Sequence, residues 1–112
     1  MTHLQQSDSP SRNPSRYPPL DRVGACYVAC ASSFTALALW MSVQSSWLGW
    51  LSGQLLLAIT MIQWFAILHE AGHKTLFRHQ RLNKWTAYLA GFCAIIPGDC
   101  WRIVHAKHHY WT

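Results

Sequence analysis

The runs VGACYVACASSFTALALWMSV (residues 23–43) and WLGWLSGQLLLAITMIQWFAIL (residues 47–68) decide the expected fold of this chain. Neither run contains a charged residue, and only the polar link QSS (residues 44–46) separates them. As helices they would be roughly 31–33 Å long, enough to cross a bilayer core about 30 Å thick. Because the link is so short, the two helices must run antiparallel. The sequence therefore predicts an all-α membrane protein that is built on a two-helix transmembrane hairpin.

The composition argues against an ordinary soluble domain. Of the 112 residues, 51% are hydrophobic and only 12% are charged, whereas roughly 25% of the residues in a typical soluble domain are charged. The net charge of +5 would suit nucleic acid, but the cations flank apolar runs and form no stripe among exposed aromatic side chains. We therefore expect the lipid bilayer as a partner, and no nucleic acid.

The segments that flank the hairpin indicate its orientation. Residues 1–22 are rich in Ser, Pro and Arg, which predicts a disordered polar tail. Basic residues stand before and after the hairpin and are absent from its link: Arg12, Arg16 and Arg22 precede it, and Lys74, Arg78, Arg81 and Lys84 follow it. Positively charged flanks stay on the cytoplasmic side of a membrane. We therefore expect an integral membrane protein with both termini in the cytoplasm.

Five of the seven histidines lie in two short motifs, HEAGH (residues 69–73, box 1) and HAKHH (residues 105–109, box 2). On a helix, the two histidines of box 1 share one face, and so do the three of box 2, because they are spaced i, i+3, i+4. Neutral imidazole is the commonest metal ligand among side chains. We therefore predict a metal site whose ligands are His69, His73, His105, His108 and His109.

The segment between the boxes is too short to cross the membrane. Residues 85–97 form an apolar run of 13 residues, which suits a helix that lies in the interface or dips into the bilayer and returns. The break Pro97-Gly98-Asp99 follows, and Asp99 is a candidate N-cap for the helix of box 2. We therefore expect cytoplasmic or interfacial helices to carry both boxes.

Box 1 also matches His-Glu-x-x-His, the signature of zinc proteases. In such a site the two histidines bind zinc and Glu70 is the general base. One catalytic zinc needs only one further protein ligand, so three histidines in box 2 would oversupply it. A membrane zinc metalloprotease is therefore an alternative that leaves much of box 2 unexplained.

Residues 23–112 resemble the N-terminal part of the membrane-bound fatty acid desaturases. That family has a first box of His-x-x-x-His type, often His-Glu-Ala-Gly-His, and a second box, His-x-x-His-His, some thirty-odd residues later. Both stand here at that separation, after an apolar hairpin. The family often has a Trp-Arg pair before its second box and a threonine three residues after the last histidine of that box. Trp101, Arg102 and Thr112 occupy those places.

The resemblance implies a function and a ligand set. Its members bind two iron ions through the box histidines, activate dioxygen and introduce a double bond into a fatty acyl chain. Ferredoxin or a cytochrome b5-type protein donates the electrons. By position, the five box histidines would be iron ligands. Glu70 has no assigned ligand role, and we interpret it as a hydrogen-bond partner of a ligand imidazole. Related lipid hydroxylases and carotenoid ketolases, which share the boxes, are a second alternative.

One departure from the family pattern affects the expected activity. The family has a third histidine box far downstream, after two further membrane spans, and this sequence ends at Thr112. From the sequence we therefore expect an incomplete ligand set and a truncated chain that is inactive alone.

Overall fold

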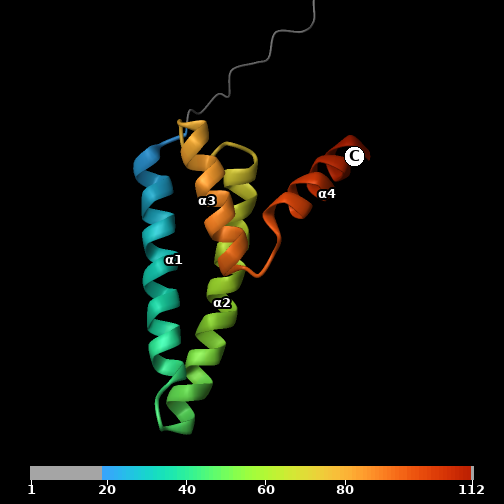
Figure 1. Ribbon diagram of the computed structural model, residues 1–112. Coiled ribbons are helices and arrows are strands. Elements are labelled where there is room, and N and C mark those ends of the chain that lie inside the picture. The colour runs from blue at the N-terminus through green and yellow to red at the C-terminus, as the bar shows by residue number, and fades with distance from the viewer. Residues whose placement is uncertain (1–18, 112) are drawn as a thin grey trace, which may run out of the picture.

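In the computed structural model, the described part of the chain is residues 19–111, without the side chains of Arg102, Ala106, His109 and Trp111. Residues 1–18 of the predicted tail lie outside it. The described chain forms four helices and no strand: α1 (Asp21–Ser42), α2 (Trp47–Gly72), α3 (Gln80–Cys93) and α4 (Gly98–Trp111). In Figure 1, α1 and α2 run antiparallel, α3 lies along the half of α2 that carries box 1, and α4 diverges from the other three.

The predicted hairpin is confirmed. Helices α1 and α2, of 22 and 26 residues, are both long and apolar enough to cross a membrane. Their boundaries differ from those expected: α1 begins at Asp21, inside the predicted tail, and α2 continues through box 1 to Gly72. Box 1 is thus part of the second long helix, so its histidines are fixed to the hairpin itself.

Two side-chain hydrogen bonds join the helices of the hairpin. The Trp64 indole Nε1–H donates to the Thr35 hydroxyl at 2.9 Å, and the Gln54 amide donates to the Ser42 hydroxyl at 3.0 Å. Such bonds hold membrane helices together, because lipid offers polar groups no other partner. The backbones approach closely beside the link, where a Cβ on Gly53 would lie 2.6 Å from the Ser42 nitrogen. Only glycine fits there without a shift of α1.

The core lies at the box 1 end of the bundle, where α3 covers the hairpin. It contains the buried side chains Ala31, Trp64, Ile67, Leu68, Ala71, Leu76, Phe77, Ala90 and Ala94. Asn83 of α3 is only 1% exposed. Its amide is paired on both sides, because Oδ1 accepts from the Phe77 N–H at 2.9 Å and Nδ2 donates to the Phe77 carbonyl at 2.6 Å. This side chain therefore fixes the loop that follows box 1 against α3.

The same loop is tied to the start of the first helix. The Asp21 carboxylate accepts from the Arg78 backbone N–H at 2.8 Å, and the Arg78 Nε–H donates to the Pro19 carbonyl at 3.2 Å. The loop after box 1 is therefore held from α1 and from α3 at once. This fixes the direction in which the chain leaves the histidines of α2.

The segment after the loop differs in two details from expectation. Helix α3 begins at Gln80, five residues before the predicted apolar run, and α4 begins at Gly98, so Asp99 lies in its first turn and is not the N-cap. The Pro97 carbonyl accepts the first helical bond of α4, from the Trp101 N–H. The chain bends by 110° between helix α3 and the first half of α4, as in a broken span or a re-entrant loop.

Candidate metal centre

The end of α2 presents the two histidines of box 1 on one face. The rings of His69 and His73 are one turn apart, with centroids separated by 4.6 Å. The helix ends at Gly72, with His73 as its C-cap, in a Schellman motif: the Lys74 N–H donates to the Ala71 carbonyl at 3.0 Å and the Thr75 N–H to the Glu70 carbonyl at 3.1 Å. Lys74 takes the left-handed conformation that this motif requires, with φ 62°. The backbone therefore turns away beyond His73 and leaves the imidazoles accessible.

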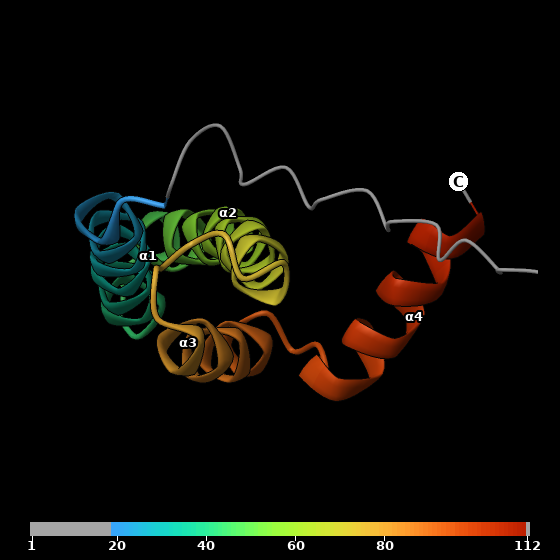
Figure 2. The same cartoon turned by 90° about the horizontal axis from the view of Figure 1, so that it is seen from above.

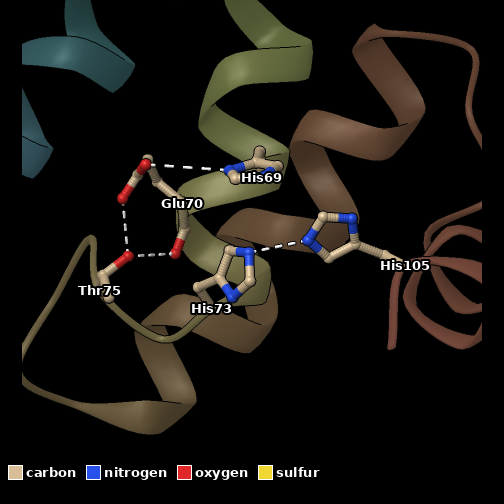
Figure 3. Close-up of polar contacts among 5 residues, drawn as sticks. All are labelled: His69, Glu70, His73, Thr75 and His105. Atoms are coloured by element: carbon tan, nitrogen blue, oxygen red, sulfur yellow. Dashed lines mark hydrogen bonds and ion pairs between the residues drawn. The ribbon is translucent and has the colours of Figure 1, made fainter. Parts of the chain in front are cut away.

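Helix α4 brings His105 of box 2 to the same place. Its Nε2 lies 2.8 Å from Nε2 of His73, and its ring centroid is 4.8 Å from those of His69 and of His73. The ligand nitrogens of the three residues all lie within 4.8 Å of one another. Figure 3 shows the three rings facing one another across the gap between α2 and α4. We call these three residues the histidine cluster.

The other two predicted ligands lie apart from the cluster or outside the described residues. His108 is exposed on α4, and its ring centroid is 6.3 Å from that of His105. The side chain of His109 is not among the described ones. The structure thus brings together three of the five predicted ligands, and ligation by His108 and His109 stays a prediction.

Trp101 is a site residue whose contacts sequence reasoning did not foresee. Its ring stacks on His105, with centroids 4.5 Å apart and an interplanar angle of 14°, and it lies 5.9 Å from the ring of His69. It also packs on the backbone of α2, because a Cβ on Gly72 would lie 2.4 Å from Trp101 Cζ3. The glycine of box 1 therefore makes room for the ring that stacks on His105 of box 2. The Trp-Arg pair before box 2 was the available signal.

The carboxylate of Glu70 is held on the other side of His69. Glu70 Oε1 lies 3.9 Å from His69 Nδ1, within ion-pair distance but beyond hydrogen-bond distance. The Thr75 hydroxyl shares its proton between Glu70 Oε2 at 2.7 Å and the Glu70 carbonyl at 2.9 Å. Figure 3 shows Glu70 pointing toward Thr75 and away from His105. The carboxylate can thus orient His69 after a small rotation, but it does not face the space between the three rings.

The donor set of the cluster suits a metal ion. Two imidazole nitrogens bound to one ion, each about 2.0–2.1 Å from it, lie roughly 2.9–3.4 Å apart. The 2.8 Å between His73 and His105 is close to this range. These two nitrogens share a hydrogen bond, so one of them carries a proton that an incoming cation must displace. The three residues therefore fit a metal ion and supply three neutral nitrogen ligands.

Comparisons with known proteins give one consistent result. The fatty acid desaturase family matches residues 45–112. An sn-1 oleoyl-lipid 12-desaturase of a Picosynechococcus species is 31% identical over 88 residues, which are 79% of this chain and 23% of that protein. A Delta(12) fatty acid desaturase of Mortierella alpina is 24% identical over 94 residues, covering 77% of this chain and 24% of the relative.

The name of a third relative includes ferredoxin. An sn-1 acyl-lipid omega-3 desaturase (ferredoxin) of a Synechocystis species is 33% identical over 45 residues, which are 40% of this chain and 12% of that protein. No solved structure matches the chain significantly. The chain spans about a quarter or less of the length of the curated relatives it matches.

Proposed function

The chain belongs to the fatty acid desaturase family, and we propose that it supplies histidine ligands to a non-haem di-iron centre that introduces a double bond into a fatty acyl chain. One observation carries the proposal. His73 of box 1 and His105 of box 2, 32 residues apart in the sequence, meet at 2.8 Å. Two boxes that formed separate surface features would have no reason to meet.

Family membership confirms the resemblance drawn from the boxes and supports a desaturase over a zinc protease. The matched family is one of desaturases, and the zinc protease alternative loses its basis. The position of Glu70 supports the same choice. A general base must face the water on the metal, whereas the Glu70 carboxylate is engaged by Thr75 on the far side of His69.

Each residue of the centre has a proposed role. His69, His73 and His105 would hold one ion, and His108 and His109 of box 2 would add further imidazole ligands to the set. After a small rotation, the carboxylate of Glu70, held by Thr75, would accept the Nδ1–H of His69 and so leave the other nitrogen of His69 for the metal. When bound, two iron ions would supply the activation of dioxygen for removal of two hydrogens from the acyl chain.

The surroundings of the centre suit the proposed reaction. Dioxygen is reduced to water by two electrons from the acyl chain and two from a donor, which we propose is ferredoxin or a cytochrome b5-type protein. The name of one relative includes ferredoxin.

We propose that the acyl chain reaches the centre from the bilayer. The basic flanks of the hairpin keep both termini, and hence both boxes, in the cytoplasm, where a soluble donor can dock.

Metal analysis of the full chain tests the proposal. The chain is purified in neutral detergent without metal, offered Fe²⁺ under anaerobic conditions or Zn²⁺, and its metal content is measured per chain. Iron should be retained, and retention should fall when His73 is replaced by alanine. Glu70→Gln should weaken iron binding less than His73→Ala, because Glu70 only orients a ligand. Binding of one zinc ion and no iron would contradict the di-iron proposal.

A further inference from the structure

A cavity of about 350 Å³ lies beside the histidine cluster, between the end of α2, helix α3 and the first turn of α4. Its inner wall is apolar and includes the buried residues Leu68 and Ala71. Gly72 and Trp101 also line it. Trp101 is the ring that stacks on His105, so one aromatic side chain borders both the cavity and the candidate metal centre.

The rim of the cavity is positively charged. Lys74, Arg81 and Lys84 line it and are exposed. Within residues 19–111, the structure gives none of the three an ion-pair partner; Lys84 Nζ lies 6.0 Å from the centre of the Tyr88 ring. Asp99 lines the cavity too, and its carboxylate accepts from the Tyr88 hydroxyl at 3.4 Å. The three cations and one carboxylate give the rim a net charge of +2, which favours the binding of an anion.

The position of the rim favours a membrane lipid over a soluble anion. Lys74 lies two residues after the end of the long apolar helix α2, where a membrane protein is expected to meet lipid headgroups. Helix α3, which forms one wall of the cavity, exposes large apolar side chains elsewhere on its surface, with Trp85 71% and Phe92 83% exposed, as expected of a helix in contact with the bilayer. An apolar wall below a cationic rim matches a molecule with an apolar chain and an anionic head.

We propose that this cavity binds the phosphate-bearing headgroup of an anionic membrane glycerolipid, with an acyl chain of the same lipid directed past Trp101 toward the histidine cluster. This inference rests on the proposed function, because it names the form in which the acyl chain is presented. Lys74, Arg81 and Lys84 bind the phosphate, and Leu68 and Ala71 contact the start of the chain. The apolar wall offers nothing to an anion that lacks a chain.

Native mass spectrometry of the full chain in neutral detergent tests this inference. Three probes are titrated: dihexanoyl phosphatidylglycerol, dihexanoyl phosphatidylcholine and glycerol 3-phosphate. The phosphatidylglycerol should bind roughly tenfold more tightly than the other two, because the rim selects the charge and the wall selects the chain. Equal retention of both lipids would overturn the proposed selectivity. Equal retention of glycerol 3-phosphate would overturn the assignment to a lipid.

A matched pair of double variants distinguishes binding by the rim cations from an effect of the net charge of the chain. Arg81→Gln with Lys84→Gln removes two cations from the rim, and Arg22→Gln with Lys107→Gln removes two cations elsewhere on the described chain. The first pair should abolish the preference for the anionic lipid, and the second should keep it. A similar loss in both would overturn the proposed site, since net charge alone would then explain binding.

Iron content, measured on the same samples, distinguishes this inference from the proposed function. The rim variants should retain iron as the unchanged chain does, because no rim cation belongs to the histidine cluster. Iron retention without lipid preference overturns the inference and leaves the proposed function standing. Lipid preference in a chain that never retains iron supports the cavity and overturns the proposed function.

Discussion

The hairpin and helix α4 differ in the contacts that hold them in place. Helices α1 and α2 lie side by side and are joined by two interhelical hydrogen bonds, and α3 covers their box 1 end. Helix α4 diverges from this bundle, as Figure 2 shows from above. It reaches α2 through Trp101 on Gly72 and through His105 on His73. The Tyr88 hydroxyl of α3 also donates to Asp99 of α4. The hairpin is therefore held along its length, whereas α4 is held through its first two turns.

This difference determines what each region contributes to the centre. Two histidines of the cluster share a helix of the fixed bundle, so their spacing is set before any metal binds. The third lies on α4, and its distance from the others depends on how Trp101 sits against Gly72. Substitutions in the bundle should therefore change stability, whereas substitutions between α2 and α4 should change metal affinity.

The largest effect is expected from His105→Ala, which removes the ligand that α4 brings to box 1. Iron affinity of the full chain should fall by at least about a hundredfold, the upper end of the loss seen when a residue that only supports a ligand is replaced. Thermal unfolding in detergent should change little. The matched control is His79→Ala, since His79 makes no side-chain cap bond to α3. Equal loss of iron in both variants would refute the assignment of His105.

The next largest effect should come from Asn83→Ala, within the bundle. The variant leaves the buried N–H and carbonyl of Phe77 without partners, at a cost of about 2–3 kcal/mol in the free energy of unfolding. Gln80→Ala, at an exposed polar position of the same helix, should cost less than about 0.5 kcal/mol. Chemical unfolding in mixed micelles measures both, and similar costs would show that Asn83 does not fix the loop.

Gly72→Ala should affect the stability of the bundle and the iron affinity differently. Alanine favours the helix by about 1 kcal/mol over glycine, but its Cβ would lie 2.4 Å from Trp101 Cζ3 and must displace α4. We expect unchanged or higher stability of the bundle with iron affinity lowered about tenfold, as for loss of a residue that supports a ligand. In a Trp101→Ala background the same change should have no further effect on iron. A further loss there would mean that Gly72 acts without Trp101.

The smallest effect is expected from Lys74→Gly. Lys74 holds a left-handed conformation with φ 62°, which costs a non-glycine residue roughly 1–2 kcal/mol and glycine almost nothing. Part of this gain is lost to the greater freedom of glycine in the unfolded chain, which leaves about 0.5–1 kcal/mol. Lys74→Ala removes the same side chain but keeps Cβ, so it should give no gain. Thermal unfolding compares the two variants, and equal stabilities would contradict the predicted strain.

Sequence predicted the parts of this structure that depend on length and polarity. Helices that cross a membrane must be long and uncharged, and α1 and α2 could therefore be placed within a few residues. The start of α3 could not, since residues 80–84 are mostly polar and the helix is fixed there by bonds from Asn83 to a loop. The link from Asp21 to Arg78 joins segments whose pairing no local pattern reveals. The orientation in the membrane stays a prediction.

Local sequence patterns were also insufficient to predict how the candidate site is assembled. Spacing within each box predicted which histidines share a face, because helical periodicity is local. It could not predict that His105 alone among the described box 2 side chains would join His69 and His73, since this depends on the direction of α4. Nor could it show that Gly72 receives Trp101. Both features arise from packing between two helices.

The histidine cluster gives metal binding a mechanical consequence. An ion held by His73 and His105 would close a loop of 32 residues, much as a disulfide does, and a cross-link of that length is worth about 3.5–4 kcal/mol in chain entropy. The ion would therefore act as a staple that fastens α4 to the bundle. Iron supply would then govern maturation: a chain made during iron starvation would expose α4 to proteases, and loading would protect it. The rate at which the cell degrades the protein would then depend on whether the metal site is occupied.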